Sequence, residues 1–266
     1  MWSSGGSGQL GLKRGNCIGD AILAAVLVIL TFFGPAIGPA RADGPCRSLQ
    51  FEETPFTACV ADPRRHTFRL LLKRPDATAY GDLAALPQDG LLFATNAGMF
   101  APDFSPAGLY IEDGKTLKPL NTVVSGFGNF HMQPNGVFWI SDGTAGVTPT
   151  AKFAKLKTKV DIATQSGPML VIGGAVNAKF EANGSSLHVR NGVGVDAQGR
   201  VAVAISEVPV SFGRFARFFR EALGCPNALY LDGSVSDLLV AGKRSPSGGR
   251  RLGPLLGVYA QSTAPR

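Results

Sequence analysis

Short runs of β-type sequence, separated by tight-turn signals, constrain this chain more than any other feature. Dipeptides such as Asp89-Gly90, Asn135-Gly136 and Asp142-Gly143 favour two-residue turns, because glycine and asparagine readily adopt the positive φ that these turns need. The short apolar runs between such signals predict strands. The predicted strands are residues 56–60, 67–72, 91–95, 108–111, 137–140, 169–172, 187–189, 193–195, 201–205, 228–231 and 255–259.

One segment has the periodicity of a helix instead. Within residues 211–223 the apolar side chains recur at helical spacing, Ser211 can cap the N-terminus, and Gly224 can end the helix. Residues 151–157 predict a short second helix. These elements together predict the α+β class, with mixed, strand-rich sheets and one principal amphipathic helix packed on them in a single domain.

Residues 1–42 have the order of a signal peptide. Basic residues precede the apolar run 21–33, and the A-x-A cleavage signal Ala40-Arg41-Ala42 follows it. We predict cleavage after Ala42 and a mature domain of residues 43–266 in the periplasm or outside the cell. The apolar run is shorter than the roughly 20 residues that span a bilayer, so no stable membrane span is expected after cleavage. The alternative is an uncleaved N-terminal anchor.

The cysteines agree with export, because disulfides form in oxidising compartments. Cys46 and Cys59 flank two predicted strands and predict a disulfide. Cys225 follows the principal helix and is expected to be a buried free thiol, with a nucleophilic role as the alternative.

Charge and composition exclude several classes of protein and site. With 17% charged and 45% hydrophobic residues, the chain is not intrinsically disordered. The net charge of +7 is scattered, so no nucleic-acid partner is expected. No C-x-x-C pair occurs and the histidines are isolated, so neither a metal nor another cofactor is expected. Residues 243–251, KRSPSGGRR, are interpreted as a surface loop, with contact to an acidic ligand as the alternative.

Four segments differ from ordinary strands and turns: residues 96–100 (NAGMF), 166–169 (SGPM), 190–195 (RNGVGV) and 231–236 (LDGSVS). In the first two, glycine at a strand exit lets the backbone turn sharply and expose its amides. The third offers an arginine, the preferred residue for bidentate phosphate binding. In the fourth, Asp232 ends an apolar strand, where a carboxylate is costly unless it is paired or functional. Taken singly, the first three also fit plain turns or a surface arginine.

In this order the four segments resemble the phosphodiester glycosidase family, in its short bacterial branch, from about residue 93 to 259. One departure is Ser234, which stands where the family often has glycine and is expected to narrow the pocket. The matching positions are Asn96, Gly98 and Phe100 in N-x-G-x-F, Ser166 and Gly167 in S-G-P, Arg190 and Gly194 in R-x-x-x-G, and Asp232, Gly233 and Ser236 in L-D-G-G-x-S.

The resemblance implies an exported hydrolase that cleaves the glycosidic bond of a sugar-1-phosphodiester, or a related linkage in surface polysaccharide or exopolysaccharide. A carbohydrate or sugar phosphate is then the expected substrate. Arg190 is expected to hold the phosphate, and Asp232 to be the nucleophile or general base. Glu207, after the strand at 201–205, is the second candidate carboxylate. The expected substrate-binding residues are Asn96, Gly98, Phe100, Ser166, Gly167, Gly194, Gly233 and Ser236.

Two other functions remain open from the sequence. Ser234 and Val235 favour a non-catalytic protein that binds a glycan or phosphoglycan on the same fold. A phosphodiesterase that cuts the P–O bond would release a different pair of products.

Overall fold

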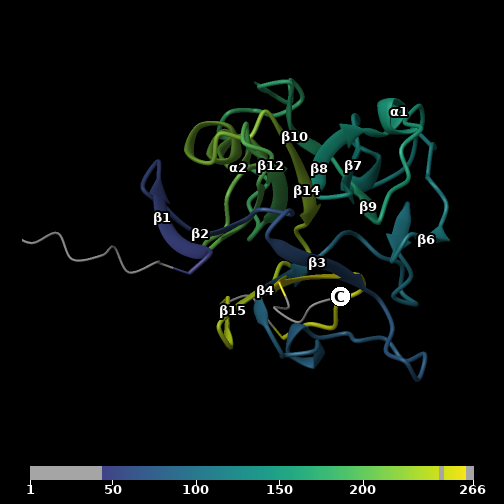
Figure 1. The fold of residues 1–266 in the computed structure, drawn as a ribbon. Coiled ribbons are helices and arrows are strands. Elements are labelled where there is room, and N and C mark those ends of the chain that lie inside the picture. The colour runs from purple at the N-terminus through teal and green to yellow at the C-terminus, as the bar shows by residue number, and fades with distance from the viewer. Residues whose placement is uncertain (1–43, 246–248, 262–266) are drawn as a thin grey trace, which may run out of the picture. The chain divides into compact units, whose positions relative to one another are not determined.

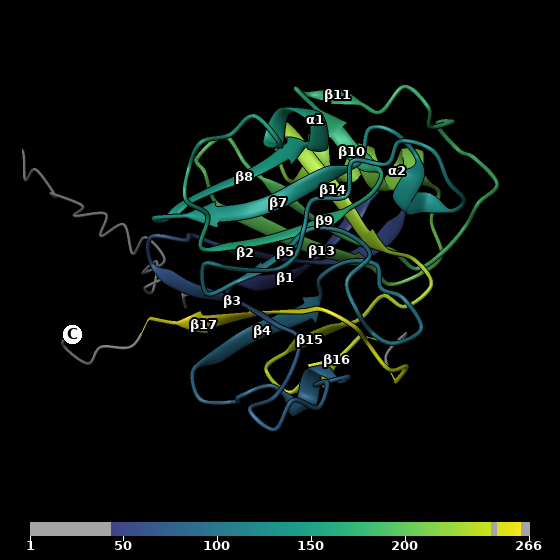
Figure 2. The ribbon, with the colours of Figure 1, turned by 90° about the vertical axis from the view of Figure 1, so that its right-hand side faces the viewer.

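Antiparallel strands in three sheets form most of the regular structure of the computed structural model, which describes residues 44–245 and 249–261 (Figures 1 and 2). The predicted signal peptide and its cleavage site lie outside the described residues. The predicted α+β class is confirmed, because strands dominate the described residues and one principal helix packs on a sheet.

The largest sheet contains residues 191–195 and 231–232, which belong to two of the four segments that the sequence singled out. Its inner strands are buried along almost their whole length, so a polar side chain within them needs a partner. The order of its strands is β1 (Cys46–Phe51), β2 (Thr54–Ala61), β13 (Val201–Ser206), β12 (Asn191–Val195), β14 (Asn227–Asp232), β10 (Met169–Ile172) and β11 (Ala175–Val176).

Two five-stranded sheets complete the strand framework. One has the order β16 (Lys243–Arg244), β15 (Leu238–Val240), β4 (Leu91–Asn96), β17 (Leu255–Ala260) and β3 (His66–Leu71). The other has the order β6 (Lys115–Lys118), β5 (Tyr110–Glu112), β9 (Ile162–Ser166), β7 (Gly136–Ser141) and β8 (Thr144–Pro149).

The sheets are layered around one central apolar core. β8 contacts β12 and β14 of the largest sheet, while β3 contacts β5 and β9. Figure 2 shows β7 and β8 in front of β14, and the sheet of β3, β4 and β17 below them. Phe93, Phe138 and Leu229, one from each sheet, belong to the same buried cluster. This layering brings the ends of β4, β9 and β14 together.

The predicted principal helix is present, and its π-helical end was not predicted. The side chain of Ser211 accepts a hydrogen bond from the amide of Arg214 at 3.2 Å and caps α2 (Phe212–Arg217). The π-helical turn η3 (Phe218–Ala222) continues it to Gly224, whose φ is +62°. The buried phenylalanines of α2 and η3 pack against the largest sheet, where both helical segments contact β10.

The other helical segments in the described residues are short. They are η1 (Leu83–Ala85), η2 (Asn129–His131) and α1 (Thr150–Phe153), the last of which overlaps the start of the second helix predicted at residues 151–157. None of the described helices is both long enough and apolar enough to cross a bilayer.

One predicted strand is wrong. Residues 187–189 pair only through a single bridge between His188 and Val210, and Leu187 is 55% exposed. An apolar run without a neighbouring strand has no ladder to join, and local pattern does not reveal this. Other strands were not predicted, among them β6, which is exposed throughout, and β9, which is buried throughout.

The predicted disulfide between Cys46 and Cys59 is confirmed, and it joins residues directly opposite each other on β1 and β2. Cys225 is buried and free, as predicted, and burial raises the pKa of its thiol to about 12. A thiol held protonated in this way is a poor nucleophile.

Replacing both bridged cysteines with serine should lower the free energy of unfolding by about 3 kcal/mol, because the bridge restricts the unfolded chain. Urea unfolding of the double variant and of the wild type, each with and without reductant, measures this. The Cys225→Ala variant is the control, and its stability should still fall on reduction. Equal stability of the double variant and the oxidised wild type would contradict the prediction.

Candidate active site

The candidate site forms where β14 ends in a bulge. Asn191 of β12 is opposite Asp232, but Gly192 is opposite Tyr230, so Leu231 is an extra residue in β14. The hydroxyl of Ser166 donates to the carbonyl of Leu231 at 2.8 Å and satisfies this buried backbone group. Bulges are frequent beside active sites because they redirect a side chain, and here the redirected residue is Asp232.

Asp232 is a buried carboxylate, 6% exposed. Its Oδ1 accepts hydrogen bonds from the amides of Ser234 at 2.8 Å and Val235 at 3.3 Å. Removal from water raises the pKa of this carboxyl to about 6, although the backbone hydrogen bonds oppose the shift. Among the described ion pairs, none involves Asp232. A strand-end carboxylate that is desolvated and lacks a cation is typical of a functional site.

A cavity of about 530 Å³ lies in front of Asp232. One part of its wall is polar and includes the carboxylate, while the other part is largely apolar. This combination suits a ligand with a sugar face and polar substituents. The lining residues are Met99, Phe100, Ala101, Pro102, Gly128, Asn129, Asp232, Ser234 and Val235.

Two buried asparagines hold the loop of residues 232–237 in place. Asn191 accepts a hydrogen bond from the amide of Asp232 at 3.0 Å, and it donates to Oδ1 of Asn96 at 2.8 Å. Asn96 in turn donates to the carbonyl of Val235 at 2.8 Å and accepts from the amide of Asp237 at 2.9 Å. Both asparagines are fully buried, so in this geometry Asn96 positions the loop rather than contacting a ligand.

The predicted glycines serve close packing behind the cavity. A Cβ at Gly233 would lie 1.5 Å from the hydroxyl oxygen of Tyr230, and one at Gly167 would lie 2.7 Å from Cβ of Asn135. Gly98 has a φ of +141°, a conformation that other residues rarely adopt. These positions exclude side chains for lack of space or for their backbone geometry.

Ser236 and Gly194 also contact other parts of the protein closely. The hydroxyl of Ser236 donates to the carbonyl of Asp232 at 2.6 Å and closes the loop. Gly194 lies elsewhere, near the C-terminal end of β12, where a Cβ would be 2.7 Å from Sγ of Cys225. Of the predicted substrate-binding residues, Phe100 is the one that lines the cavity.

Arg190 is not placed as expected, because its side chain is fully buried beneath the site. Its guanidinium donates to the carbonyls of Val210 at 2.9 Å and Ser186 at 2.8 Å, and to the hydroxyl of Tyr230 at 3.0 Å. It also stacks 3.6 Å from the ring centroid of Phe212. Direct contact with a phosphate does not fit this geometry, since protein groups surround the guanidinium.

Arg190 nevertheless reaches the cavity indirectly. The hydroxyl of Tyr230, which accepts its hydrogen bond, also contacts the side chain of Asn129 in the cavity wall. Burial raises the pKa of Tyr230, so its hydroxyl stays protonated and remains able to donate. Among the described residues, no carboxylate forms an ion pair with Arg190.

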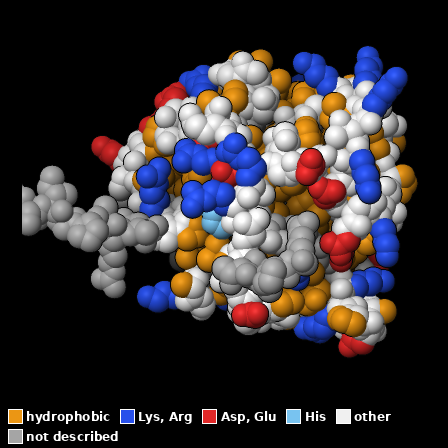
Figure 3. Space-filling view, in the orientation of Figure 1, with side chains coloured by type: hydrophobic (Ala, Val, Ile, Leu, Met, Phe, Trp, Pro, Cys, Tyr) orange, Lys and Arg blue, Asp and Glu red, His pale blue; other side chains and the backbone are white. Residues whose placement is uncertain are grey.

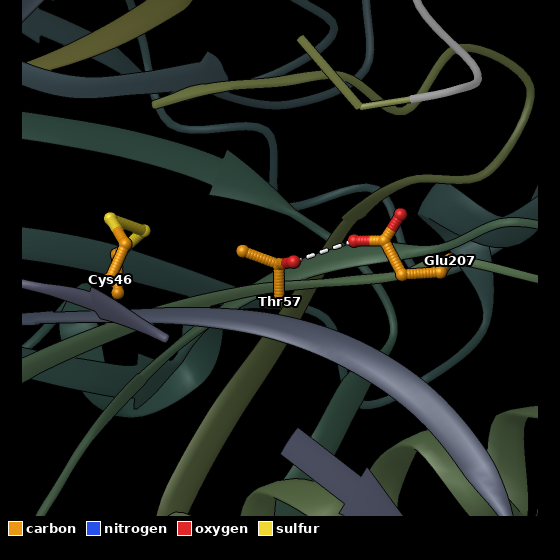
Figure 4. Close-up of a disulfide and its surroundings, with 4 residues drawn as sticks. Cys46, Thr57 and Glu207 are labelled. Carbon is orange, nitrogen blue, oxygen red and sulfur yellow. Dashed lines mark hydrogen bonds between the residues drawn. A yellow bond between two sulfur atoms is a disulfide. The ribbon is translucent and has the colours of Figure 1, made fainter. Parts of the chain in front are cut away.

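Glu207 lies away from Asp232. It accepts a hydrogen bond from the hydroxyl of Thr57 of β2 at 2.6 Å, on the side of Thr57 away from the disulfide of Cys46 (Figure 4). It lines a different pocket, together with residues such as Lys243. The structure therefore does not bring the two predicted carboxylates into one cavity.

Sequence reasoning missed Tyr230, Asn129 and Asn191. Asn191 stands beside Arg190 in a segment already singled out, and an amide within a buried strand is a signal that was available. Tyr230 and Asn129 gave no such signal, because a tyrosine in an apolar strand and an asparagine after glycine are both commonplace.

We searched the described residues for side chains that could together bind a metal ion. In residues 44–245 and 249–261, no three His, Cys, Asp or Glu side chains gather closely enough to hold a metal ion. Asp232 is the one carboxylate among the residues that line the cavity.

The surface charge lies in separate groups on the face shown in Figure 3, with acidic side chains among the basic ones. Ion pairs such as Arg64–Asp62 and Arg217–Glu52 neutralise part of it. The expectation of no nucleic-acid partner stays a prediction.

Comparison with known proteins decides the family. A family model described as phosphodiester glycosidase matches residues 89–259. The chain belongs to the phosphodiester glycosidase family. Its Escherichia coli K12 relative YigE, an uncharacterized protein, is 30% identical over 225 residues, which cover 83% of this chain and 85% of YigE.

Solved structures of other proteins share the fold. The catalytic domain of zebrafish N-acetylglucosamine-1-phosphodiester alpha-N-acetylglucosaminidase, auto-inhibited by its pro-peptide, is 16% identical, with a TM-score of 0.57 over 81% of this chain and 82% of that one. A hypothetical protein from Synechocystis is 17% identical, with a TM-score of 0.51 over 81% of this chain and 61% of that one. At these identities the likeness supports the fold and leaves activity to the site.

Proposed function

We propose that the mature protein is an exported hydrolase that cleaves the glycosidic bond of a sugar-1-phosphodiester, or a related linkage in surface polysaccharide or exopolysaccharide. The observation that carries this proposal is Asp232, a desolvated carboxylate without a cation in the wall of a ligand-sized cavity. Membership of the phosphodiester glycosidase family supports the same chemistry.

A single carboxylate is enough for this reaction. Most glycosidases need a second carboxyl group to protonate the leaving oxygen. A phosphate monoester leaves as a stable anion near neutral pH and needs little protonation. Asp232 then acts as the nucleophile at the anomeric carbon, or as the base that activates water, in agreement with its being the one carboxylate of the cavity wall.

Arg190 is proposed to be a positioning residue. Its guanidinium donates to the oxygen of the Tyr230 hydroxyl and so fixes that hydroxyl against the side chain of Asn129 in the cavity wall. This role replaces the direct phosphate contact expected from the sequence.

The proposed location is the periplasm or the cell exterior. The disulfide between Cys46 and Cys59 supports it, because disulfides persist in oxidising compartments. The signal-peptide pattern of residues 1–42 points to the same location.

A non-catalytic glycan- or phosphoglycan-binding protein is the second candidate. The observation that favours it is Ser234, an exposed side chain in the cavity wall at a position where the family often has glycine. On this alternative, Asp232 would bind sugar hydroxyls and no product would form.

The pH dependence of turnover tests the role of Asp232. Because the base or nucleophile must be ionised and its pKa is about 6, kcat/KM should fall about tenfold per pH unit below pH 6 and level off above it. The phosphodiester does not titrate in this range, so the profile reports the enzyme. Release of sugar from a p-nitrophenyl sugar phosphodiester between pH 4 and 8 measures it.

The same assay separates the candidate functions. Activity that falls above pH 6 would contradict a nucleophile or base and indicate a general acid. Binding without released sugar would favour the glycan-binding protein, and ¹⁸O from water on phosphorus rather than on carbon would indicate a phosphodiesterase.

A further inference from the structure

An arginine far from Asp232 in the sequence reaches the wall of the cavity. Nη1 of Arg250 donates a hydrogen bond to the carbonyl of Ser234 at 3.0 Å, and Ser234 lines the cavity two residues after Asp232. Both Arg250 and Ser234 are exposed to solvent. The contact places a guanidinium at the polar end of the cavity.

The proposed substrate carries a negative charge, and the residues that line the cavity include no cation to neutralise it. None of them is Lys or Arg, and Arg190 is enclosed by protein groups. Among the described residues, Arg250 is the cation that hydrogen-bonds to a lining residue. It forms no ion pair with a described carboxylate.

We propose that Arg250 and the hydroxyl of Ser234 form the phosphate-binding end of this cavity. Arginine presents five N–H donors, and the structure records one of those of Arg250 in use, on the Ser234 carbonyl. The opposite edge of the guanidinium suits bidentate binding to two phosphate oxygens. Its charge stabilises the anion that departs when the glycosidic bond breaks.

This inference rests on the proposed function for its substrate, and it gives Ser234 a purpose. Glycine at this position would offer no side-chain donor. Serine adds a hydroxyl beside the guanidinium, so the departure from the family pattern becomes a determinant of specificity for an anionic group.

Anion binding tests the proposal without requiring turnover. Titration calorimetry with inorganic phosphate and with glucose 1-phosphate compares the wild type with Arg250→Ala, Ser234→Gly and the matched control Arg251→Ala. Arg251 carries the same charge next in the chain but stacks on Phe104, 4.5 Å from its ring centroid. Thermal unfolding confirms that the variants are folded.

We expect Arg250→Ala to weaken binding of both anions by about tenfold or more, because a charged hydrogen-bonding partner is lost. Ser234→Gly should weaken binding by less, and Arg251→Ala should change it by less than about twofold. Wild-type affinity in Arg250→Ala, an equal loss in Arg251→Ala, or no binding by the wild type at millimolar concentrations would overturn the proposal.

Failure of this inference differs from failure of the proposed function. If the protein hydrolyses a sugar phosphodiester and Arg250→Ala keeps the wild-type kcat/KM, the phosphate-binding role is wrong and the hydrolase stands. If no hydrolysis occurs but phosphate binds through Arg250, the binding end stands and the hydrolase is wrong.

Discussion

Replacing Asp232 with asparagine should reduce turnover by roughly 10²–10⁴-fold while leaving the protein folded. Asparagine has nearly the same shape, and its carbonyl oxygen can still accept the amide hydrogen bonds of Ser234 and Val235. What it lacks is the negative charge and basicity that the proposed reaction needs. Turnover of a p-nitrophenyl sugar phosphodiester by the two proteins measures the loss.

The same substitution should stabilise the protein at neutral pH. The pKa of Asp232 is raised from 3.8 to about 6 on folding, so the folded state holds the proton more tightly than the unfolded chain does. Wild-type stability therefore falls as the pH rises from about 4 to 6, and the full cost of roughly 3 kcal/mol is present above pH 6. Asp232→Asn avoids this cost.

Urea unfolding at two pH values measures the effect. The variant should exceed the wild type by up to about 3 kcal/mol at pH 7.5, and the difference should nearly vanish at pH 3.5. Asp196→Asn is the matched control, because Asp196 is buried but paired with Arg200 at 2.7 Å, in the turn after β12. That variant should keep its turnover and should not gain stability at neutral pH.

Two outcomes would contradict this account separately. Full turnover by folded Asp232→Asn would remove Asp232 from the chemistry. A loss of stability at pH 7.5 would show that the buried charge is compensated, and that the raised pKa does not describe the folded protein.

Replacing Arg190 with methionine should lower the free energy of unfolding by at least about 3 kcal/mol. Methionine fills part of the volume but removes the charged hydrogen bonds to the carbonyls of Val210 and Ser186 and to the hydroxyl of Tyr230. A hydrogen bond to a charged group contributes roughly 1.5–3 kcal/mol. The contact with the ring of Phe212 is lost as well. Urea unfolding measures the change.

Arg190→Lys keeps the test informative if the methionine variant does not fold. An ammonium retains the charge but cannot reach Val210, Tyr230 and Ser186 together, so a loss of about 1–3 kcal/mol is expected. Wild-type stability in both variants, with weaker phosphate binding, would restore the direct phosphate contact predicted from the sequence. Wild-type stability with unchanged binding would exclude both roles.

Local pattern predicted much of the framework. The strand at 201–205 and the helix at 211–223 were recognised because their alternation, apolar spacing and capping residues depend on near neighbours. The strand at 187–189 failed because pairing requires a partner elsewhere in the chain. The π-helical end at residues 218–222, whose phenylalanines are buried against the sheet, was not predicted either.

The site divided in a similar way. The sequence alone identified the segments that meet and singled out Asp232, because a carboxylate after an apolar strand is anomalous in any fold. It could not say which side chains face the cavity. Asn96 and Arg190 are residues of types that often bind ligands, yet the side chains of both form hydrogen bonds with groups of the protein itself.

For this protein, the sequence by itself determined the α+β class, the pairing of Cys46 with Cys59 and the family, and it predicted Asp232 as the catalytic carboxylate. Only the tertiary structure decided that Arg190 lies beneath the cavity, that Glu207 lies in another pocket, and that Arg250 reaches Ser234. The physical reason is the distance along the chain over which each effect acts. Propensity, capping and spacing act within a few residues, whereas the direction and burial of a side chain depend on strands distant in the chain.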